Sequence, residues 1–499
     1  MNDSKTLQAD IVITTANPAG ICAAIAAARL GSSVLLLEPD PVIGGLNTSG
    51  LNNNEQHHMH PVETFGGLCR EHFRRLARFH PDSWEKYPGW FHSRDALSIW
   101  EEMLGEVEGV TLLTNRQVTG LEKNGDRIQA LLLEDGDRVE GKVFLDTTYE
   151  GDLLNWGEIS HRLGREARSE REPSAGVTWN DEVIPVSPYD EAGLLPGICA
   201  ESEPELGAAS PLVQNMNFRL TLTDDPDNRL PIPEVAPGDP REFELLARAF
   251  AAKQIVELRK VIGLYPLPGR KFECNNNQQA ILSLSPRGFA NPWIHATPGE
   301  RREMLADVRQ QNLRLLRFLK DDPRVPDDIR AHMSRLGLPA DEYPHNDHWP
   351  YEIYVREGRR LEGEIVLDET DTLGGGTHSD TIAFASHFMD CHWVERYPAG
   401  RDGFRNEGRL WRPGKIHPLP YRCMLPKPGE CENLLVPVAV SATHVAFCTI
   451  RLEPTWMKLG EAAGAAAAMS LADNVSPRNV NVPKLQQHLR EQGGILDLR

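Results

Sequence analysis

The stretch IVITTANPAGICAAIAAARLGSSVLLLEP, residues 11–39, constrains the fold of this chain more than any other. An apolar run over 11–13 predicts a buried strand, an Ala-rich segment over 18–30 predicts a helix, and an apolar run over 34–37 predicts a second strand. This order is typical of the βαβ unit that binds dinucleotides, and Glu38 follows where a ribose-binding carboxylate is expected. The chain is therefore expected to be an α/β protein with a Rossmann-like domain.

The glycine signature of this unit is incomplete. When G-x-G-x-x-G is laid with its last glycine on Gly20, Thr15 and Asn17 occupy the first two glycine positions. A side chain at the second position crowds a pyrophosphate, whereas Gly20 keeps the close packing of helix on strand. Pro18 suits the start of a helix, whose free N–H groups attract phosphate. We therefore expect a dinucleotide here, with a βαβ unit that holds no ligand as the alternative.

Length, charge and cysteine usage narrow the class of protein. A chain of 499 residues is expected to form two or more domains, and a net charge of −19 disfavours nucleic acid and anionic membranes. No apolar run approaches the roughly 20 residues of a membrane span, and the residues before the first strand, which lack a signal-peptide h-region, are not expected to be a signal peptide. The 8 cysteines include no C-x-x-C pair, a pattern typical of reduced thiols in the cytoplasm. We expect a cytoplasmic enzyme without nucleic-acid or membrane partners.

The remaining pattern alternates regular and irregular stretches. Helices are predicted over 63–78 and 93–105, and the β-prone runs over 110–148, separated by Asn-Gly-Asp and Asp-Gly-Asp, predict an antiparallel meander. Residues 165–420 are irregular and rich in Pro and Trp, with one clear helix over 300–319. The segment after residue 430 restores the order of strand, loop and Ala/Gly-dense helix.

Four longer segments resemble one flavoprotein family. They are EPDPVIGGLNTSGLNN, FLDTTYEGDLLNWGEISHRLGREARSE, DEYPHNDHWPYEIYVREGRRLEGE and PYRCMLPKPGECENLLVPVAVSATHVAFCTIRLEPTWMKLGEAAGAAAA. They are similar to the E-P…G-G, D-A-T-Y-E-G-D-L…G-R-E-A, H-W-P…Y-V-R-E-x-R-R and C-terminal segments of FAD-dependent oxidoreductases of glutathione-reductase-like fold. The family usually has Gly-Gly where this chain has Thr15 and Ala16, and often Thr at the place of Asn17. FAD is nevertheless expected to bind.

This resemblance implies an α/β fold with a Rossmann-like FAD-binding domain of the glutathione-reductase type and a second, mixed α+β substrate or cap domain. The pattern along the chain predicts that 1–165 form the N-terminal part of the FAD domain (βαβ unit, helices and β-meander) and that 421–499 form the C-terminal part of this discontinuous domain. Residues 166–420 are expected to be the cap domain with its helical insert, or else one large insert. The residues implied to hold FAD are Pro18, Ala19, Gly20, Glu38, Pro39, Gly44, Gly45, Leu46, Asp146, Thr147, Gly151, Asp152, Ser441, Thr443, Thr455 and Met457.

The segment ASHFMDCHWVERY supplies a candidate base. Asp390 lies two residues before His392, so a strand would place both on one face, where the carboxylate can orient the imidazole. Oxidation of a C–H that bears oxygen or nitrogen needs a base for the heteroatom proton while hydride leaves to the flavin. We expect His392 to be this base and His444 to be the second candidate. An Asp-His pair that only fixes a loop is the alternative.

The C-terminal block supplies candidates near the flavin. Ser441, Thr443, His444 and Arg451 are expected in a loop before a helix that starts near Pro454. That helix N-terminus would direct positive potential toward the flavin and stabilise the anion formed on reduction. Arg451 can add a fixed cation, or it can pair with Glu453, and His444 is either catalytic or structural. We expect His392 and His444 to lie close together on the substrate side.

Other clusters carry weaker signals. The histidines of HHMH, 57–60, lack the i, i+4 spacing of a helical metal site and have no carboxylate cluster beside them, so no metal is predicted. CNNNQQ, 274–279, is amide-rich and can bind hydroxyl groups.

The function expected from these observations is FAD-dependent oxidation of a small organic substrate, polyhydroxylated or ring-shaped, by hydride transfer. The alternatives are a non-redox enzyme (lyase, hydrolase or isomerase) and a catalytically silent binding protein on the same scaffold. The sequence leaves the substrate, the electron acceptor and the oligomeric state open.

Overall fold

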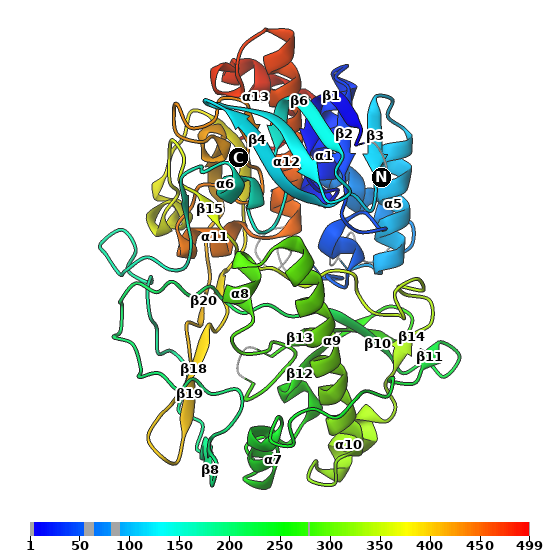
Figure 1. Ribbon diagram of the computed structural model, residues 1–499, viewed down its shortest axis with the longest axis vertical. Coiled ribbons are helices and arrows are strands. Elements are labelled where there is room, and N and C mark those ends of the chain that lie inside the picture. The colour runs from blue at the N-terminus through cyan, green and yellow to red at the C-terminus, as the bar shows by residue number, and fades with distance from the viewer. Residues whose placement is uncertain (1–3, 54–63, 81–89, 278–279, 499) are drawn as a thin grey trace.

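The computed structural model describes residues 4–53, 64–80, 90–277 and 280–498. Within them, seven strands form the largest sheet, in the order β3-β2-β1-β6-β5-β4 with β22 beside β6 (Figure 1). These strands are β1 (Thr6–Ile13), β2 (Val34–Leu37), β3 (Val110–Leu113), β4 (Val118–Asn124), β5 (Arg127–Leu133), β6 (Arg138–Leu145) and β22 (Leu434–Leu435).

The predicted βαβ unit is confirmed. β1 pairs in parallel with β2 and with β6, and α1 (Pro18–Arg29) connects β1 to β2. Asn17 caps α1 by accepting the Gly20 N–H at 3.0 Å, and Pro18 occupies the first turn. The carboxyl ends of the central strands therefore meet the start of α1, where α/β sheets bind ligands.

The prediction of a meander over 110–148 is wrong in its first strand. β3 pairs in parallel with β2, and only β4, β5 and β6 form the antiparallel meander, with Gly125 and Gly136 at positive φ in its turns. The reason is that β3 follows α5 (Ser93–Gly105), and a helical connection brings the next strand back in parallel.

The Ala/Gly-dense C-terminal helix, α12 (Glu453–Ala472), packs along α1 (Figure 1). A Cβ on Gly460 would lie 2.1 Å from the Ala19 carbonyl oxygen, and one on Gly464 would lie 2.1 Å from that of Ala23. Because these glycines are four residues apart, they lie on one face of α12 and allow the two backbones to touch. Both helices begin at the end of the large sheet where its parallel strands have their carboxyl ends.

The residues between 217 and 340 form a second layer below the large sheet in Figure 1. Its antiparallel sheet contains β10 (Leu220–Thr223), β13 (Lys271–Asn276) and β12 (Ile262–Leu267), in that order. Its helices are α7 (Glu244–Ala251), α8 (Ala290–His295), α9 (Pro298–Asp321) and α10 (Asp327–Met333). The predicted helix over 300–319 is α9, which begins at Pro298 because Thr297 and Glu300 form a capping box.

The described residues also form short ladders and helices. The ladders are β7 (His161–Arg162) with β15 (Arg360–Leu361), β8 (Tyr189–Asp190) with β9 (Gly193–Leu194), β11 (Arg229–Leu230) with β14 (Leu338–Pro339), β16 (Thr381–Ala385) with β21 (His417–Pro420), β17 (Met389–Cys391) with β20 (Leu410–Arg412), and β18 (Glu395–Pro398) with β19 (Phe404–Glu407). The other helices are α3 (Gly67–Leu76), α6 (Asp152–Trp156), α11 (His444–Ile450) and α13 (Val482–Glu491), with the short helical turns η1 (Gly45–Thr48), η3 (Leu258–Lys260), η4 (Asp371–Gly375), η5 (Tyr421–Met424) and η6 (Pro477–Asn479).

Two further expectations need correction. The stretch from His444, predicted as a loop, is helix α11, because Thr443 caps it by accepting the Ala446 N–H and seven buried residues follow. The helix predicted over 63–78 is α3, which is shorter, and residue 63 lies outside the described residues. In the part of the chain that the structure describes, no helix is long and apolar enough to cross a bilayer.

Candidate functional site

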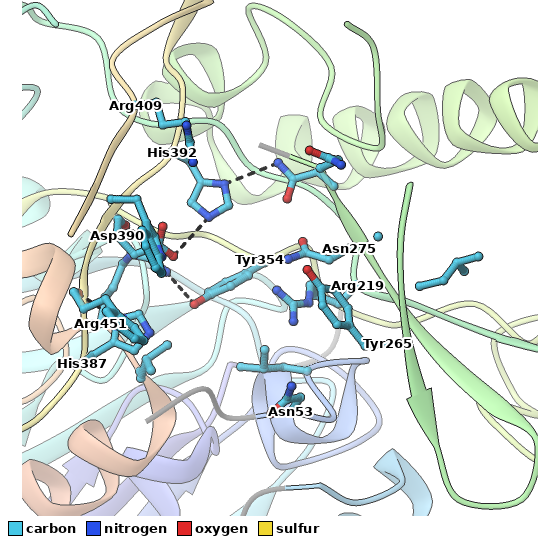
Figure 2. Close-up of a pocket in the computed structure, with 18 of the residues that line it drawn as sticks. Asn53, Arg219, Tyr265, Asn275, Tyr354, His387, Asp390, His392, Arg409 and Arg451 are labelled. Carbon is cyan, nitrogen blue, oxygen red and sulfur yellow. Dashed lines mark hydrogen bonds and ion pairs between the residues drawn. The ribbon is translucent and has the colours of Figure 1, made fainter. Parts of the chain in front are cut away.

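Two cavities flank the loop that follows β2. The larger, of about 840 Å³, lies between the two layers of the fold (Figure 2). Its lining is Leu51, Asn53, Arg219, Arg259, Gly263, Leu264, Tyr265, Asn275, Asn276, Asn277, Tyr354, His387, Phe388, Asp390, His392, Arg409, Trp411, Arg451 and Leu452. The smaller, of about 160 Å³, opens at the start of α1 and includes Thr15, Asn17, Glu38, Pro39 and Asp152. The volume of the larger cavity is that of a typical small-molecule site.

Three of the four predicted catalytic residues line the large cavity together. The Asp390 carboxylate lies 3.4 Å from His392 Nε2 and accepts a hydrogen bond of 3.0 Å from Arg451 Nη2 (Figure 2). Arg451 also donates to the Asp390 backbone oxygen at 2.6 Å and to the Tyr354 hydroxyl at 2.7 Å. The guanidinium is thereby fixed by Asp390 and Tyr354, and the alternative pairing with Glu453 is not the one formed, because Glu453 accepts from Tyr149 at 2.6 Å.

The hydrogen bonds around His392 indicate which ring nitrogen carries the proton. Asn276 Oδ1 accepts from Arg356 Nη2 at 3.1 Å, so the Asn276 amide nitrogen faces His392 Nδ1 at 3.5 Å. Nδ1 is then the acceptor, and Nε2–H is donated to Asp390. Burial, with the cation of Arg356, lowers the pKa of His392 to about 3 against the opposing effect of Asp390. The imidazole is therefore neutral at physiological pH, with its lone pair on Nδ1.

The lining of the large cavity contains more arginine than acidic side chains, in a chain that is acidic overall. Among the described lining residues, the arginines are Arg219, Arg259, Arg409 and Arg451, and the carboxylate is Asp390. The carboxylates that pair with the first three arginines, Glu273, Glu257 and Asp181, do not belong to the lining. Guanidinium groups at a cavity wall favour carboxylate or phosphate ligands.

The small cavity is built on Glu38, at the end of β2. The Glu38 carboxylate accepts from the backbone N–H of Ala16 at 2.9 Å and of Asp40 at 3.0 Å. Burial and the neighbouring Asp40 raise the pKa of Glu38 well above its ordinary value. Across the cavity, Asp152 forms a bidentate ion pair with Arg301 at 2.6 and 2.8 Å. The cavity thus presents carboxyl oxygens beside the turn that precedes α1.

The glycines at this turn allow close approach of the backbone. A Cβ on Gly20 would lie 1.9 Å from the Thr15 carbonyl oxygen, so Gly20 keeps the packing role predicted for the third glycine. Gly44 and Gly45 have φ of 98° and 51°, and a Cβ on Gly45 would lie 2.7 Å from Cβ of Asn17. The loop after β2 therefore folds directly over the start of α1.

Buried polar atoms around this loop lack partners among the described residues. They include Oδ1 and Nδ2 of Asn47, in η1, and Oε2 of Glu453, at the start of α12. Tyr149, whose hydroxyl accepts from the Leu46 N–H at 3.2 Å, links the loop to Glu453. Buried polar groups are normally satisfied, so unpaired atoms on both η1 and α12 are consistent with a polar ligand at this place.

Other predicted cofactor residues hold the scaffold rather than line either cavity. Thr147 binds the Thr14–Asn17 turn, and Asp146 accepts from Thr148 and from the Leu153 N–H at the start of α6. Burial raises the pKa of Asp146 to about 7. Gly151 (φ 68°), Ser441, Thr443, Thr455 and Met457 are likewise outside both linings.

His444 does not lie beside His392 in the large cavity, contrary to the expectation. It points from α11 toward Glu357, which its Nδ1 contacts at 2.7 Å, and Gln214 lies between the two histidines. The helical turn at Thr443 is the reason, because it directs His444 to the side of α11 that faces away from the cavity lining.

Several lining residues carry no sequence motif. Arg219, Tyr265 and Arg409 come from the part of the sequence in which no regular pattern was found. Tyr354 lies in a segment that resembles the family. His387 is three residues before Asp390. Asn275, Asn276 and Asn277, from the amide-rich stretch, do line the cavity, but Gln278 and Gln279 lie outside the described residues, as do the histidines at 57–60.

The chain belongs to a family described as FAD dependent oxidoreductase, whose sequence model matches residues 10–489. No curated protein sequence matches the chain. A geranylgeranyl bacteriochlorophyll reductase-like protein from Thermoplasma acidophilum is 11% identical over 98% of this chain and 85% of its own, with a TM-score of 0.35.

Two other solved structures match over a smaller part. L-proline dehydrogenase from P. horikoshii is 15% identical over 34% of this chain, with a TM-score of 0.20, and NikD, an amino acid oxidase of nikkomycin biosynthesis, is 15% identical over 32%, with a TM-score of 0.23. The chain spans 25% of the first and 56% of the second. With scores this low, the assignment rests on the family match.

Membership of this family implies FAD as the cofactor. The residues present fit this cofactor: a carboxylate ends β2, the small cavity opens beside it at the start of α1, and unpaired polar atoms lie on η1 and α12. Asn17 at the second glycine position does not close the small cavity, because its amide caps α1 and donates to the Thr147 carbonyl at 2.6 Å.

Proposed function

We propose that this chain oxidises a small organic anion at a C–H bond that bears oxygen or nitrogen, in the large cavity. The observation that carries the proposal is the contact of Asp390, His392 and Arg451 in a cavity whose lining also includes arginine, amide and aromatic side chains. The arginines match a carboxylate, and the asparagines and tyrosines match hydroxyl groups or a ring. When bound, FAD supplies the two-electron acceptor.

The proposed proton acceptor is Nδ1 of His392. Its contact with Asn276 is long, at 3.5 Å, so a substrate O–H or N–H can replace the amide there. Asp390 accepts Nε2–H and stabilises the imidazolium that forms when Nδ1 takes the proton. A base with a pKa of about 3 is weak in the free protein, and a bound anion beside Arg451 would raise it by offsetting the nearby cations.

Arg451 is proposed to bind the anionic group of the substrate. Its Nη atoms are fixed by Tyr354 and Asp390, and its side chain is 1% exposed, so it meets substrate with little loss of conformational freedom. Burial opposes the charge of Asp390, yet His392 and Arg451 hold the pKa of Asp390 well below its ordinary value. The cavity therefore keeps one fixed cation and one fixed anion at its inner wall.

For the cofactor, we propose that Glu38, Pro39 and Asp152 bind the adenosine side and that Gly20, Gly44 and Gly45 admit the pyrophosphate. We further propose a glutathione-reductase type of FAD domain made of 1–165 and 421–499, with 166–420 as the cap. The pairing of β22 with β6 and the packing of α12 on α1 support this division, because the C-terminal segment returns to the first sheet.

A matched substrate panel tests the proposal. The FAD-loaded protein is mixed anaerobically with 2-hydroxy and 2-amino carboxylic acids, and with the amide of each, while the flavin absorbance is followed. We expect acids, but not their amides, to bleach the flavin. Equal rates for an acid and its amide would refute an anionic substrate, and bleaching by neither class would refute the proposed reaction.

An arginine variant tests where the carboxylate of the substrate binds. Arg451→Gln should raise the half-saturating concentration of the acid about tenfold, a loss of about 1.4 kcal/mol. Arg270→Gln is the control, since Arg270 lies at the surface and pairs with Asp224. Equal affinities of the two variants for the acid would show that the substrate carboxylate does not bind Arg451.

A further inference from the structure

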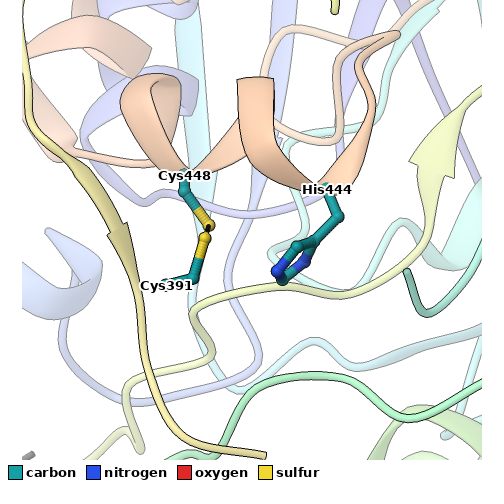
Figure 3. A group of neighbouring side chains, drawn as sticks. All are labelled: Cys391, His444 and Cys448. Carbon is teal, nitrogen blue, oxygen red and sulfur yellow. Dashed lines mark hydrogen bonds between the residues drawn. The ribbon is translucent and has the colours of Figure 1, made fainter. Parts of the chain in front are cut away.

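Two cysteines meet behind the wall of the large cavity. Cys391 ends β17 and Cys448 lies in α11, 57 residues later, yet their sulfur atoms are 2.9 Å apart (Figure 3). Both side chains are buried, with exposed fractions of 1% and 0%. Successive strand residues face opposite sides, so Asp390 lines the cavity while Cys391 faces α11.

A histidine and its partners surround this pair. His444 precedes Cys448 by one helical turn, and a ring nitrogen of His444 lies within 4.8 Å of both sulfurs. His444 Nδ1 contacts Glu357 Oε2 at 2.7 Å, and Glu357 pairs with Arg360. Because Glu357 is paired with an arginine, its carboxylate accepts the hydrogen bond from His444. Nδ1 therefore carries the proton of His444, and the other ring nitrogen keeps a lone pair.

The same surroundings favour ionisation of Cys448. Gln214 Nε2 donates to Cys448 Sγ at 3.3 Å and to Glu357 Oε2 at 3.0 Å. Burial opposes the charge, but the hydrogen bond from Cys391, together with His444 and Arg451, lowers the pKa of Cys448 to about 5. Burial and the same bond raise the pKa of Cys391. One thiolate and one thiol are thereby held in contact.

The other buried thiols for which a shift is resolved behave in the ordinary way. Burial raises the pKa of Cys22, Cys69, Cys274, Cys423 and Cys431. Thiolates are the reactive form of cysteine, and a thiol kept protonated by burial is inert. Cys448 therefore differs from these cysteines in both contact and charge.

We propose that Cys391 and Cys448 are a redox-active dithiol that closes to a disulfide, with a peroxide as the two-electron oxidant. A disulfide needs a sulfur separation of about 2.05 Å, so the two atoms have to approach by less than ~1 Å. The enclosed position excludes bulky oxidants, which is why a small, neutral peroxide is the class that fits. The proposal is independent of the substrate proposed for the cavity.

The reaction balances in two steps. The Cys448 thiolate attacks one oxygen of hydrogen peroxide, the O–O bond breaks, and the departing hydroxide takes one proton from solvent, equal to the proton that Cys448 released on ionising, and leaves as water. The Cys391 sulfur then attacks Cys448, the S–O bond breaks, and a second water leaves with the Cys391 proton. Two thiols are oxidised, one peroxide is reduced, and one S–S bond forms.

The disulfide would connect the two segments that supply Asp390 and Arg451 to the cavity. Asp390 precedes Cys391 in β17, and Arg451 is the residue at which α11 ends. Arg451 and Asp390 already bind one another, at 3.0 Å. The disulfide would thus lie directly behind this ion pair and fix the distance between its two backbones.

Thiol counting on the FAD-loaded protein tests the proposal. The protein is treated with one equivalent of hydrogen peroxide, denatured in an alkylating reagent, and digested without reductant. We expect two of its 8 cysteines to escape alkylation and one cross-linked peptide pair to join residues 391 and 448. Retention of all thiols, or a cross-link between other cysteines, would overturn the proposal.

Two variants separate the proposed chemistry from a structural role. In Cys391→Ser, a sulfenic acid should form at Cys448 and be trapped by a 1,3-dione, because the resolving thiol is gone. Cys423→Ser is the control and should still lose two thiols and form the same cross-link. Absence of the trapped adduct from a folded Cys391→Ser protein would contradict the role of Cys448.

Metal analysis tests the alternative that the same side chains bind a metal ion. Two cysteines and one histidine are a donor set that zinc can use. The protein is purified without chelator and its metal content is measured before the peroxide is added. One zinc per chain, with both thiols protected from peroxide, would overturn the dithiol proposal in favour of a metal site, whereas a metal-free protein that loses both thiols supports it.

Discussion

Replacement of Gly464 by alanine tests the contact that holds α12 against α1. A new Cβ would lie 2.1 Å from the carbonyl oxygen of Ala23, a backbone atom that cannot rotate away. The two helices would have to separate by about 1 Å or more to restore ordinary contact, and overpacking of this kind costs about 1–3 kcal/mol. Helix propensity acts in the opposite direction, by about 1 kcal/mol.

The two effects predict opposite signs, which makes the variant informative. We expect Gly464→Ala to lower the free energy of unfolding and to retain less FAD after dialysis, because α1 and α12 both start beside the proposed FAD site. Gly105→Ala is the matched control: Gly105 ends α5, and a Cβ there meets nothing within 4 Å.

The assay is thermal unfolding of both variants, together with the flavin absorbance that remains after dialysis. Gly105→Ala should melt at or above the temperature of the original protein and keep its flavin. If Gly464→Ala also melts at or above that temperature, the close contact between α1 and α12 is not what packs this part of the fold, and the reasoning fails.

Three further predictions concern single carboxyl or imidazole groups. Glu38→Ala should weaken FAD binding by about 1–3 kcal/mol, measured as FAD released at equilibrium dialysis, and unchanged retention would mean that Glu38 does not bind the ribose. His392→Ala should slow flavin reduction by substrate roughly 10²- to 10⁴-fold with an unchanged flavin spectrum. In the free protein the pKa of His392 is lowered to about 3, so at substrate concentrations far below saturation the base stays unprotonated and the rate should not fall between pH 7.5 and 5.5, whereas an ordinary histidine would lose about tenfold. Burial raises the pKa of Glu461 from 4.5 to about 7, so the folded state binds this proton more tightly and its contribution to stability is lost as pH rises between these values. Glu461→Gln, which can still accept from the Leu68 N–H, should therefore gain stability over the original protein by up to about 3 kcal/mol between pH 5 and pH 8, and an equal difference in melting temperature at both pH values would contradict this.

Local signals in the sequence were sufficient for the first unit of the fold. The strand over 34–37 and the helix over 93–105 have the predicted bounds, because each is a run of apolar or amphipathic residues with a capping or turn signal at its ends. The parallel pairing of β3 was missed, since strand direction depends on the connection that precedes the strand rather than on its own residues.

The candidate site was predictable only where two of its residues are close in sequence. Asp390 and His392 are two positions apart, and period-two alternation correctly placed them on one side. Arg219 and Tyr354 reach the same cavity from segments far apart in the chain, and no local pattern encodes that meeting. His444 was expected beside His392 because a loop was predicted where α11 forms, and the helix turns its imidazole toward Cys448 instead.

A crystal structure of the FAD-loaded protein with a bound carboxylate substrate tests the central claim most directly. The account predicts adenosine beside Glu38, the flavin next to the large cavity, and the substrate carboxylate on Arg451 with its reacting O–H or N–H at Nδ1 of His392. A flavin that lies away from the large cavity, or a substrate that contacts neither Arg451 nor His392, would contradict it.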